Sequence, residues 1–359
     1  MKLTSFTRAC LSSLFQPVLH LNRRTLNCAS SLNPQIPLFL RPATYKSTIS
    51  DLRKWHIWAK NLASSVGSSF LEIDNGPDSI LLHRELNWFI EDAVEKPSAL
   101  SNSGNGIEVD DAGLVSLRAR LEELYLLWKQ RIELRRPFQY LVGCEHWRDL
   151  VLSVQEGVLI PRPETELIVD LVSDVIKENE ELRDGLWADL GTGSGALAIA
   201  IARILGTSGR VVAIDLSPIA VGVTSYNVQR YHLQGKVTVQ QGSWFEPLRG
   251  YEGKFAGLVS NPPYIPTENI TGLQAEVGKH EPRLALDGGA DGLNDLLHLC
   301  NGAASILRPG GFFIFETNGE RQSMFLLDYM ETRLKGYFRN VKITSDFAGI
   351  KRFVGGYRT

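Results

Sequence analysis

The pattern of apolar positions divides the chain near residue 186. Between residues 51 and 136, apolar side chains recur at steps of three or four, the spacing that places them on one face of a helix. Residues 80–90 carry such a stripe, and a second is formed by Leu114, Leu117, Leu121, Leu124 and Leu127. The polar, glycine-containing stretches 73–78 and 101–111 are typical of loops. The region is therefore predicted to be a small helical bundle.

From residue 186 onward, short strands alternate with helices. The expected strands are residues 186–191, 210–216, 236–242, 255–261, 311–317, 340–346 and 352–358. Helical patterns separate the first five strands and precede the sixth, which predicts an α/β fold with a doubly wound, largely parallel sheet. Only a short turn joins the last two strands, so we expect an edge hairpin whose last strand is antiparallel. Ligands of such sheets bind at the carboxyl ends of the central strands.

Length and composition limit the classes of protein that need to be considered. At 359 residues the chain should hold two folded domains and an appendage. Its net charge of −2 gives no overall basic excess for binding nucleic acid, so any such contact would be local. The four cysteines form neither a CxxC pair nor a Cys/His cluster, which argues against a disulfide framework and a metal site. No apolar run approaches the roughly 18 residues of a membrane span, so no membrane contact is expected.

The first fifty residues have a composition of their own. Residues 1–50 contain no Asp or Glu, are rich in Ser and Thr, and carry Lys2, Arg8, Arg23, Arg24, Arg41 and Lys46. Residues 3–24 can form a weakly amphipathic basic helix, which is typical of an organelle transit peptide rather than a secretory signal. A disordered basic tail is the alternative. On either interpretation, residues 1–50 are expected to be disordered and the fold to start near Ser50.

A glycine-rich loop follows the first strand of the predicted sheet. The strand ends at Asp189, and the loop Gly191, Thr192, Gly193, Ser194 and Gly195 then leads directly into an apolar helix. Glycines allow the backbone to turn tightly and to approach a ligand. The spacing GxGxG differs from both the GxGxxG of dinucleotide sites and the Walker loop. A cofactor loop is predicted, with a plain tight turn as the alternative.

The second strand ends in an acidic residue. Asp215 lies about twenty residues beyond the glycines, where a carboxylate can accept hydrogen bonds from both hydroxyls of a ribose. Ser217 suits the N-cap of the next helix, so this turn also has a structural role. The loop and Asp215 together indicate an adenosine-bearing ligand without a pyrophosphate.

The fourth strand runs into Asn261, Pro262, Pro263 and Tyr264. The two prolines fix the backbone, so that the Asn261 side-chain carbonyl and the Pro262 carbonyl can converge on one planar NH2 group. Tyr264 adds an aromatic face on which a flat amide or base can stack. Holding both N–H bonds orients the nitrogen for transfer of an activated methyl group. The alternative for such a motif on its own is a rigid turn.

These residues resemble a known family. The stretches 189–195 (DLGTGSG), 213–218 (AIDLSP) and 260–264 (SNPPY) are similar to class I methyltransferases that use S-adenosylmethionine to modify amide or exocyclic nitrogens. The flanking sequences resemble the release factor glutamine methyltransferases, the HemK or PrmC family, over roughly residues 78–359. The stretches that carry this second resemblance are residues 135–172, 242–248, 280–294 and 307–322.

The resemblance implies methylation of N5 of the glutamine in the Gly-Gly-Gln motif of class I peptide release factors, with S-adenosylhomocysteine as the second product. It implies cofactor contacts by Asp189, Gly191 to Gly195, Asp215, Trp244 beside the adenine, and Asn261. Asn261, Pro262 and Tyr264 would be catalytic, and Asn261, Pro262, Pro263 and Tyr264 would line the glutamine pocket, with no metal. Ser243 departs from the acidic residue expected before that tryptophan.

The composition of the tail, the apolar patterns and this resemblance together predict the organisation of the chain. We expect a transit peptide over 1–50, a helical substrate-docking domain over 51–136, a linker with a β-hairpin over 137–163, and a Rossmann-like methyltransferase domain over 164–359. The partner would be an organellar class I release factor, without direct contact to nucleic acid, and the enzyme would be a monomer. The arginine spacing of the tail favours the mitochondrial matrix over the chloroplast stroma.

Two alternative functions, and the roles of the charged residues in two loops, stay open at this point. A nucleic-acid amino-methyltransferase acting on adenine N6 or guanine N2 would be expected to carry a basic face. A cofactor-binding regulator without activity would bind the cofactor and transfer nothing. In 160–166, Arg162 could pair with Glu164 or line the entrance to the site. In 280–286, Glu281 could pair with Arg283 in a lid or anchor a buried loop.

Overall fold

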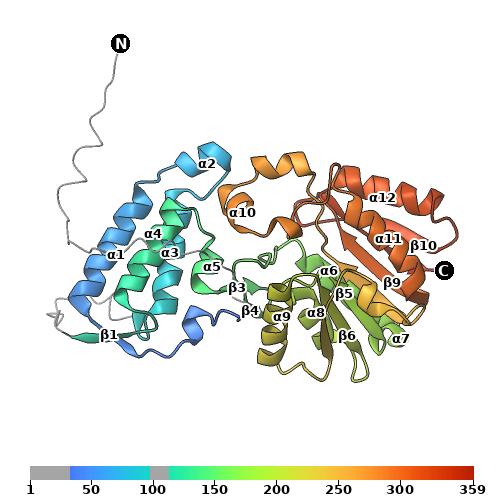
Figure 1. Ribbon diagram of the computed structural model, residues 1–359, viewed down its shortest axis with the longest axis horizontal. Helices are drawn as coiled ribbons and strands as arrows, with labels where there is room; N and C mark the ends of the chain where they lie inside the picture. The colour runs from blue at the N-terminus through green and yellow to red at the C-terminus, as the bar shows by residue number, and fades with distance from the viewer. Residues whose placement is uncertain (1–32, 98–112) are drawn as a thin grey trace, which may run out of the picture. The chain divides into compact units, whose positions relative to one another are not determined.

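The computed structural model describes residues 33–97 and 113–359 (Figure 1). Most of the predicted transit peptide and the predicted loop 101–111 lie outside these residues. The part of 1–50 that is described, residues 33–50, is folded, which corrects the expected boundary near Ser50. Leu38 in the short helix η1 (Leu38–Leu40) is fully buried among the helices. Strand β1 (Tyr45–Thr48) pairs with β2 (Leu114–Leu117), and Thr48 accepts a hydrogen bond from the Asp51 N–H as the N-cap of α1.

The helical domain is built around three longer helices. Its helices are α1 (Ile49–Ser64), α2 (Ser69–Asp74), α3 (Ser79–Ala93), α4 (Leu121–Glu133) and α5 (Phe138–Val142). Trp55 and Trp128 are fully buried between them, and the Trp128 indole donates to the Ala59 carbonyl at 3.0 Å. The helical bundle predicted from the apolar stripes is therefore confirmed in outline.

One part of that stripe forms a strand. Leu114 and Leu117 were expected on a helix but lie in β2, antiparallel to β1, and the helix begins only at Leu121. Within β2, Val115 and Leu117 are buried while Leu114 is 71 % exposed, which is the alternation of a strand and not of a helix. Pairing with residues 45–48 overrides the three-residue spacing of the leucines.

A β-hairpin follows the helical domain, as the resemblance implied. Strands β3 (Cys144–Trp147) and β4 (Leu150–Ser153) are antiparallel. Asn227 anchors the hairpin, because its side chain accepts from the Ser153 N–H and donates to both the Ser153 and the Ser194 carbonyls. The hairpin is thereby tied directly to the glycine loop.

Within residues 113–359, seven strands form the main sheet in the order β10-β11-β9-β8-β5-β6-β7. They are β5 (Leu186–Leu190), β6 (Arg210–Asp215), β7 (Val237–Gln241), β8 (Phe255–Ser260), β9 (Leu307–Glu316), β10 (Phe338–Ser345) and β11 (Lys351–Arg358). Strand β11 is antiparallel to both neighbours, β9 and β10. Every predicted strand is present, and the predicted edge hairpin is formed by β10 and β11.

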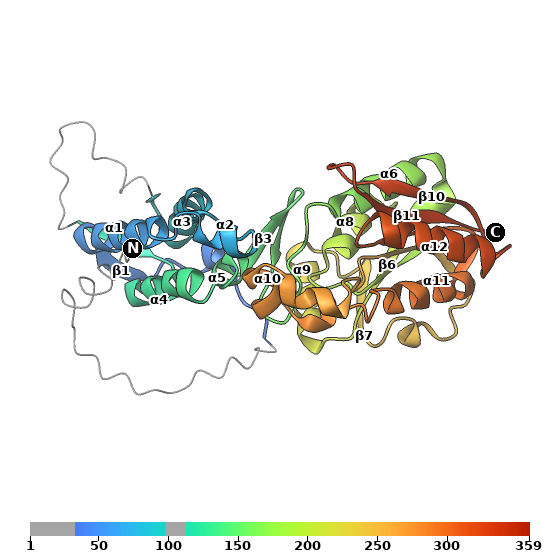
Figure 2. The same ribbon diagram turned by 90° about the horizontal axis from the view of Figure 1, so that it is seen from above.

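Helices cover both faces of the sheet (Figure 2). Helices α6 (Glu166–Glu178), α8 (Ala196–Ile204) and α9 (Pro218–Arg230) pack on one face, and α11 (Asn294–Ile306) and α12 (Glu320–Thr332) pack on the other. The remaining short helices are α7 (Glu180–Arg183), η3 (Glu246–Leu248), η4 (Thr267–Gly272), α10 (Ala275–His280) and η5 (Arg283–Ala285). This is the doubly wound α/β architecture predicted from the alternation of strands and helices.

The central strands are apolar on both sides because helices cover both faces of the sheet. In β5, Trp187 packs toward α6 and α8, whereas Ala188 and Leu190 pack toward α11. Gly257 on the neighbouring strand is opposite Trp187, and a Cβ added there would lie 2.1 Å from the indole. The large tryptophan therefore requires a glycine beside it. Among the described residues, no helix is both long enough and apolar enough to cross a membrane.

Candidate cofactor and substrate site

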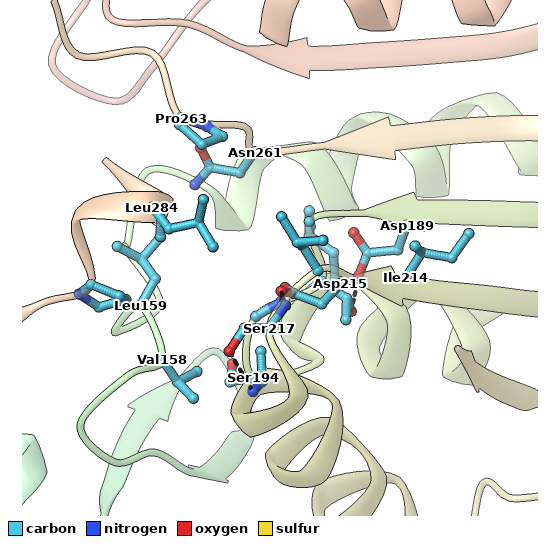
Figure 3. Close-up of a pocket in the computed structure, with 18 of the residues that line it drawn as sticks. Val158, Leu159, Asp189, Ser194, Ile214, Asp215, Ser217, Asn261, Pro263 and Leu284 are labelled. Carbon is cyan, nitrogen blue, oxygen red and sulfur yellow. Dashed lines mark hydrogen bonds between the residues drawn. The ribbon is translucent and has the colours of Figure 1, made fainter. Parts of the chain in front are cut away.

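The carboxyl ends of β5, β6 and β8 meet at a cavity (Figure 3). The predicted site residues that line it are Asp189, Gly191, Thr192, Gly193, Ser194, Asp215, Trp244, Asn261 and Pro263. Gly195 is the next residue of the loop and forms the N-cap of α8. In Figure 3, Asn261 and Pro263 lie across the cavity from Asp215 and Ser217. The structure thus brings together residues from three separate strand ends, as open parallel sheets do.

The glycine loop requires its glycines. Gly191, Gly193 and Gly195 have φ angles of 74°, 59° and 85°, in the left-handed region that side chains disfavour. Asp189 fixes the start of the loop, because its Oδ2 accepts from the Thr192 hydroxyl at 2.6 Å and from the Ala198 N–H at 3.0 Å.

The other oxygen of Asp189 has no hydrogen-bond partner within residues 33–97 and 113–359. Burial raises the pKa of Asp189 to about 7, although the hydrogen bonds from Thr192 and Ala198 favour the ionised form. A buried acceptor with a free oxygen at the cavity wall suits a ligand that brings a donor, such as an ammonium group.

Asp215 is held by backbone groups on both sides. Its Oδ2 accepts from the Gly193 N–H at 2.8 Å and its Oδ1 from the Ser217 N–H at 2.9 Å. Each carboxylate oxygen keeps a further lone pair, so the pair of oxygens can still accept from two vicinal hydroxyls. Burial raises the pKa of Asp215, and the backbone N–H groups oppose that shift. Ser217 also caps α9, accepting from the Ala220 N–H, as predicted.

Trp244 lines the cavity beside the glycine loop. Its backbone φ is 48°, and its ring packs on the glycine loop, since a Cβ at Gly191 would lie 3.6 Å from it. The indole hydrogen-bonds to Asp295, which also lines the cavity and was not predicted from the sequence. Ser243 also lines the cavity. Two side chains that can form hydrogen bonds, Ser243 and Asp295, therefore accompany Trp244 in the cavity wall.

The Asn-Pro-Pro-Tyr motif lies between two cavities. Pro263 lines the first cavity, whereas Pro262 and Tyr264 line a second one. Asn261 lines both, together with Leu159 and Arg162. The motif therefore forms part of the wall that the two cavities share.

A buried hydrogen-bond network joins the two polar members of the motif. The Asn261 amide donates to Thr165 Oγ1 at 3.0 Å, and the Thr165 hydroxyl donates to Glu316 Oε2 at 2.6 Å. The Tyr264 hydroxyl donates to Glu316 Oε1 at 3.0 Å. Thr165 and Glu316 were not predicted as site residues. Glu316 ends β9 at the same sheet edge as Asn261, which is the signal that could have identified it.

The segments 160–166 and 280–286, whose pairing was not decided from the sequence, form an ion pair with each other. Arg162 contacts Glu281 at 2.6 Å and not Glu164, and Arg283 contacts Asp287 at 2.9 Å and not Glu281. Glu281 is buried and also accepts from the Ile160 N–H. The fold places the segment before α6 against the segment after α10, so Arg162 and Glu281 form a long-range pair, whereas Arg283 keeps a local partner in Asp287.

A buried ionic cluster connects the helical domain to the same region. Arg131 donates to Glu276 at 2.9 Å and to Glu85, and Arg135 donates to Glu276 and to Asp74. Glu276 lies on α10, the helix whose Val277 lines the second cavity. The carboxylate of Glu276 therefore links α4 and the segment that follows it to the wall of the second cavity.

The fold and the site together define the class of protein. A seven-stranded sheet within residues 113–359, with one antiparallel strand, has a glycine loop after β5, an acid after β6 and Asn-Pro-Pro-Tyr after β8. This is the α/β architecture of class I methyltransferases. A protein-family profile described as "Ribosomal protein L11 methyltransferase (PrmA)" matches residues 162–273, which include all three motifs but less than half of the chain.

Similar proteins define the family within that class. The chain is 35% identical over 308 residues to the release factor glutamine methyltransferase of Synechocystis sp., covering 85% of this chain and 95% of that protein. It is 44% identical over 246 residues to the protein of the same name from Gloeobacter violaceus, covering 68% and 82% of the two chains. The release factor glutamine methyltransferase of Moorella thermoacetica is 43% identical to this chain over 222 residues, which cover 62% of this chain and 75% of that protein. The chain belongs to the release factor glutamine methyltransferase family.

Proposed function

We propose that this chain transfers a methyl group from S-adenosylmethionine to N5 of the glutamine in the Gly-Gly-Gln motif of a class I peptide release factor. The observation that carries the proposal is the position of Asn261, which lines both the cavity with the glycine loop and Asp215 and the cavity with Pro262 and Tyr264. The names of the similar bacterial proteins support the same activity.

The residues of the first cavity fit S-adenosylmethionine. Asp215 would accept from the ribose hydroxyls, Trp244 would stack on the adenine, and the free oxygen of Asp189 would accept from the ammonium group. When bound, the cofactor would supply a methyl group carried on a positively charged sulfur. As the new N–C bond formed, the electron pair of the S–C bond would stay on sulfur, which gives S-adenosylhomocysteine. The amide nitrogen would lose one proton to water.

The motif residues would hold the amide in the reactive position. The Asn261 side-chain oxygen and the Pro262 carbonyl are acceptors for the two N–H bonds of a glutamine side chain. Because an amide nitrogen is a weak nucleophile, fixing its distance and direction supplies much of the rate. The two prolines keep the acceptors in place, which a flexible turn would not do.

Methyl transfer from labelled S-adenosylmethionine to a purified organellar class I release factor tests the proposal. The matched substrate carries another residue at the Gly-Gly-Gln glutamine, and total DNA and RNA are incubated in parallel. Label on the intact factor alone is the expected result. Label on nucleic acid, or equal label on the factor without that glutamine, would overturn it.

The proposal also includes a cellular location, because the basic N-terminal segment and an organellar release factor as partner both favour an organelle. A basic segment without Asp or Glu supports import into the mitochondrial matrix, with the plastid stroma as the other destination. A full-length fusion to a fluorescent protein, compared with one lacking residues 1–32, is expected to enter the organelle only with the segment. A cytosolic signal from both fusions would contradict import. We also propose a monomer, to be measured by light scattering.

A further inference from the structure

The Asn261 side chain can present either its oxygen or its nitrogen to a substrate, and only the oxygen is useful for holding an N–H group. A rotation of the amide by half a turn exchanges the two ends at little steric cost. The group that decides between them must be a neighbour whose own hydrogen-bonding role is fixed. Thr165 is that neighbour, at 3.0 Å from the Asn261 Nδ2.

The role of Thr165 is fixed in turn by Glu316. A hydroxyl has a single proton, and that of Thr165 is given to the Glu316 carboxylate at 2.6 Å. Toward Asn261 the Thr165 oxygen can then only accept, so the NH2 end of the amide faces Thr165. Both threonine and glutamate are buried, at 5% and 1% exposure, and water does not compete for these bonds.

Tyr264 completes the arrangement. Its hydroxyl donates to the second carboxylate oxygen of Glu316 at 3.0 Å. Burial and the nearby negative charge raise the pKa of Tyr264, so its hydroxyl remains a donor. We infer that Thr165 and Glu316 are positioning residues, which fix the Asn261 amide with its oxygen toward the substrate amide and hold the Tyr264 ring in the same pocket. The inference rests on the proposed transfer to a glutamine amide.

Ionisation of Glu316 is part of this arrangement, because a protonated carboxyl could donate to Thr165 and free its hydroxyl to turn toward the Asn261 oxygen. The charged and titratable groups that face Glu316 are Arg352 from β11, Glu164 before α6, and Tyr264 after β8. Burial is the main influence and raises the pKa of Glu316 to about 7; the hydrogen bonds from Thr165 and Tyr264 and the charge of Arg352 oppose this rise, and Glu164 adds to it. The orientation of the amide should therefore be maintained above about pH 7.

Kinetics of the full-length enzyme test the inference. Thr165→Val keeps the shape of the side chain and removes the hydroxyl, and kcat is expected to fall roughly 10- to 100-fold at saturating cofactor. KM for the release factor should change much less, because selecting one glutamine in a protein substrate requires contacts beyond the side-chain pocket. Thr165→Ser should recover most of the lost kcat. The matched control is Thr317→Val, which removes a buried hydroxyl bonded to Ser323.

The pH profile separates positioning from packing. Wild-type kcat should rise with pH with a midpoint near the pKa of Glu316, and Glu316→Gln should show a lower kcat without that midpoint. Asp189 titrates in the same range but lies in the cofactor cavity, so its effect should fall on KM for the cofactor. Wild-type kcat in Thr165→Val, or an equal loss in Thr317→Val, would overturn the inference.

A readout without turnover keeps this test independent of the proposed substrate. With 15N-labelled asparagine, the Asn261 side-chain amide signals are identified by their loss in Asn261→Ala. They are expected to shift with pH near the Glu316 midpoint in the wild type and to be independent of pH in Glu316→Gln. Unchanged signals in Thr165→Val would refute the positioning role. Failure of the wild type to methylate a release factor would instead refute the proposed function.

Discussion

Arg162 Nη2 lies 2.6 Å from Glu281 Oε1, and this ion pair joins two segments whose residues line both cavities. The Glu281 side chain is 1% exposed, and that of Arg162 is 28% exposed. The carboxylate therefore depends on one partly exposed guanidinium and on the Ile160 N–H at 3.3 Å. Burial raises the pKa of Glu281, and Arg162 opposes that rise.

Replacing Arg162 by Gln should destabilise the fold in a pH-dependent manner. Without the guanidinium, the pKa of Glu281 rises further, and a raised carboxyl pKa means that stability falls as pH increases. The loss in the free energy of unfolding should be about 2 to 4 kcal/mol near pH 8 and smaller near pH 5, measured by urea unfolding. The double variant Arg162→Gln with Glu281→Gln should recover part of it. A double variant as unstable as the single one would contradict this account.

Glu276 should be among the most sensitive carboxylates of the chain. Glu276→Gln leaves Arg131 and Arg135, whose side chains are 3% and 8% exposed, without their shared charge partner. Breaking a buried pair in this way costs about 3 to 5 kcal/mol. Glu123→Gln is the control, since its partner Arg41 is 25% exposed and such pairs contribute less than about 1 kcal/mol. Urea unfolding of both variants should show this difference, and equal losses would show that the cluster is not a structural anchor.

Asp215→Asn should weaken cofactor binding through the ribose. An amide offers one acceptor where the carboxylate offers two, and it also meets the N–H groups of Gly193 and Ser217. The Kd for S-adenosylhomocysteine, measured by calorimetry, should rise roughly tenfold or more. The sharper comparison uses an analogue that lacks one ribose hydroxyl. The wild type should discriminate against it and the variant should not, whereas an equal loss for both ligands would indicate damage to the loop.

The elements that were predictable from the sequence are those encoded by local pattern. The alternation of strands and helices after residue 186 predicted the sheet because its central strands are covered on both faces and are apolar runs. Asp189, Asp215 and Asn261 were predictable because each follows such a run. Leu114 and Leu117 were misassigned because their pairing partners lie near residue 45, too far along the chain for a periodic pattern to show.

The unpredicted parts of the site depend on contacts between distant segments. Thr165 and Glu316 are 151 residues apart, and nothing in either local sequence specifies that one donates to the other. The Arg162 to Glu281 pair, 119 residues apart, was missed for the same reason, since each residue has a closer oppositely charged neighbour. Sequence spacing identifies the groups that end strands, but the fold decides which of them meet.

Glu316→Gln should separate the functional role of this residue from its effect on stability. Burial raises the folded pKa of Glu316 from the ordinary 4.5 to about 7, so the wild type loses stability as pH rises between those values. Gln cannot ionise and escapes this loss. Relative to the wild type, the variant should therefore gain stability between about pH 4.5 and pH 8, by at most roughly 3 kcal/mol.

Thermal or urea unfolding across this pH range, run beside the kinetic measurements, tests both effects. A residue that only supported packing would lose stability and activity together when changed. We expect Glu316→Gln to be less active than the wild type at pH 8, where the variant is no less stable. The reason is that the ionised carboxylate orders Thr165, Asn261 and Tyr264 while it lowers the stability of the fold. A variant that loses stability relative to the wild type as pH rises would show that the ionised carboxylate stabilises the folded state, and the separation between function and stability would fail.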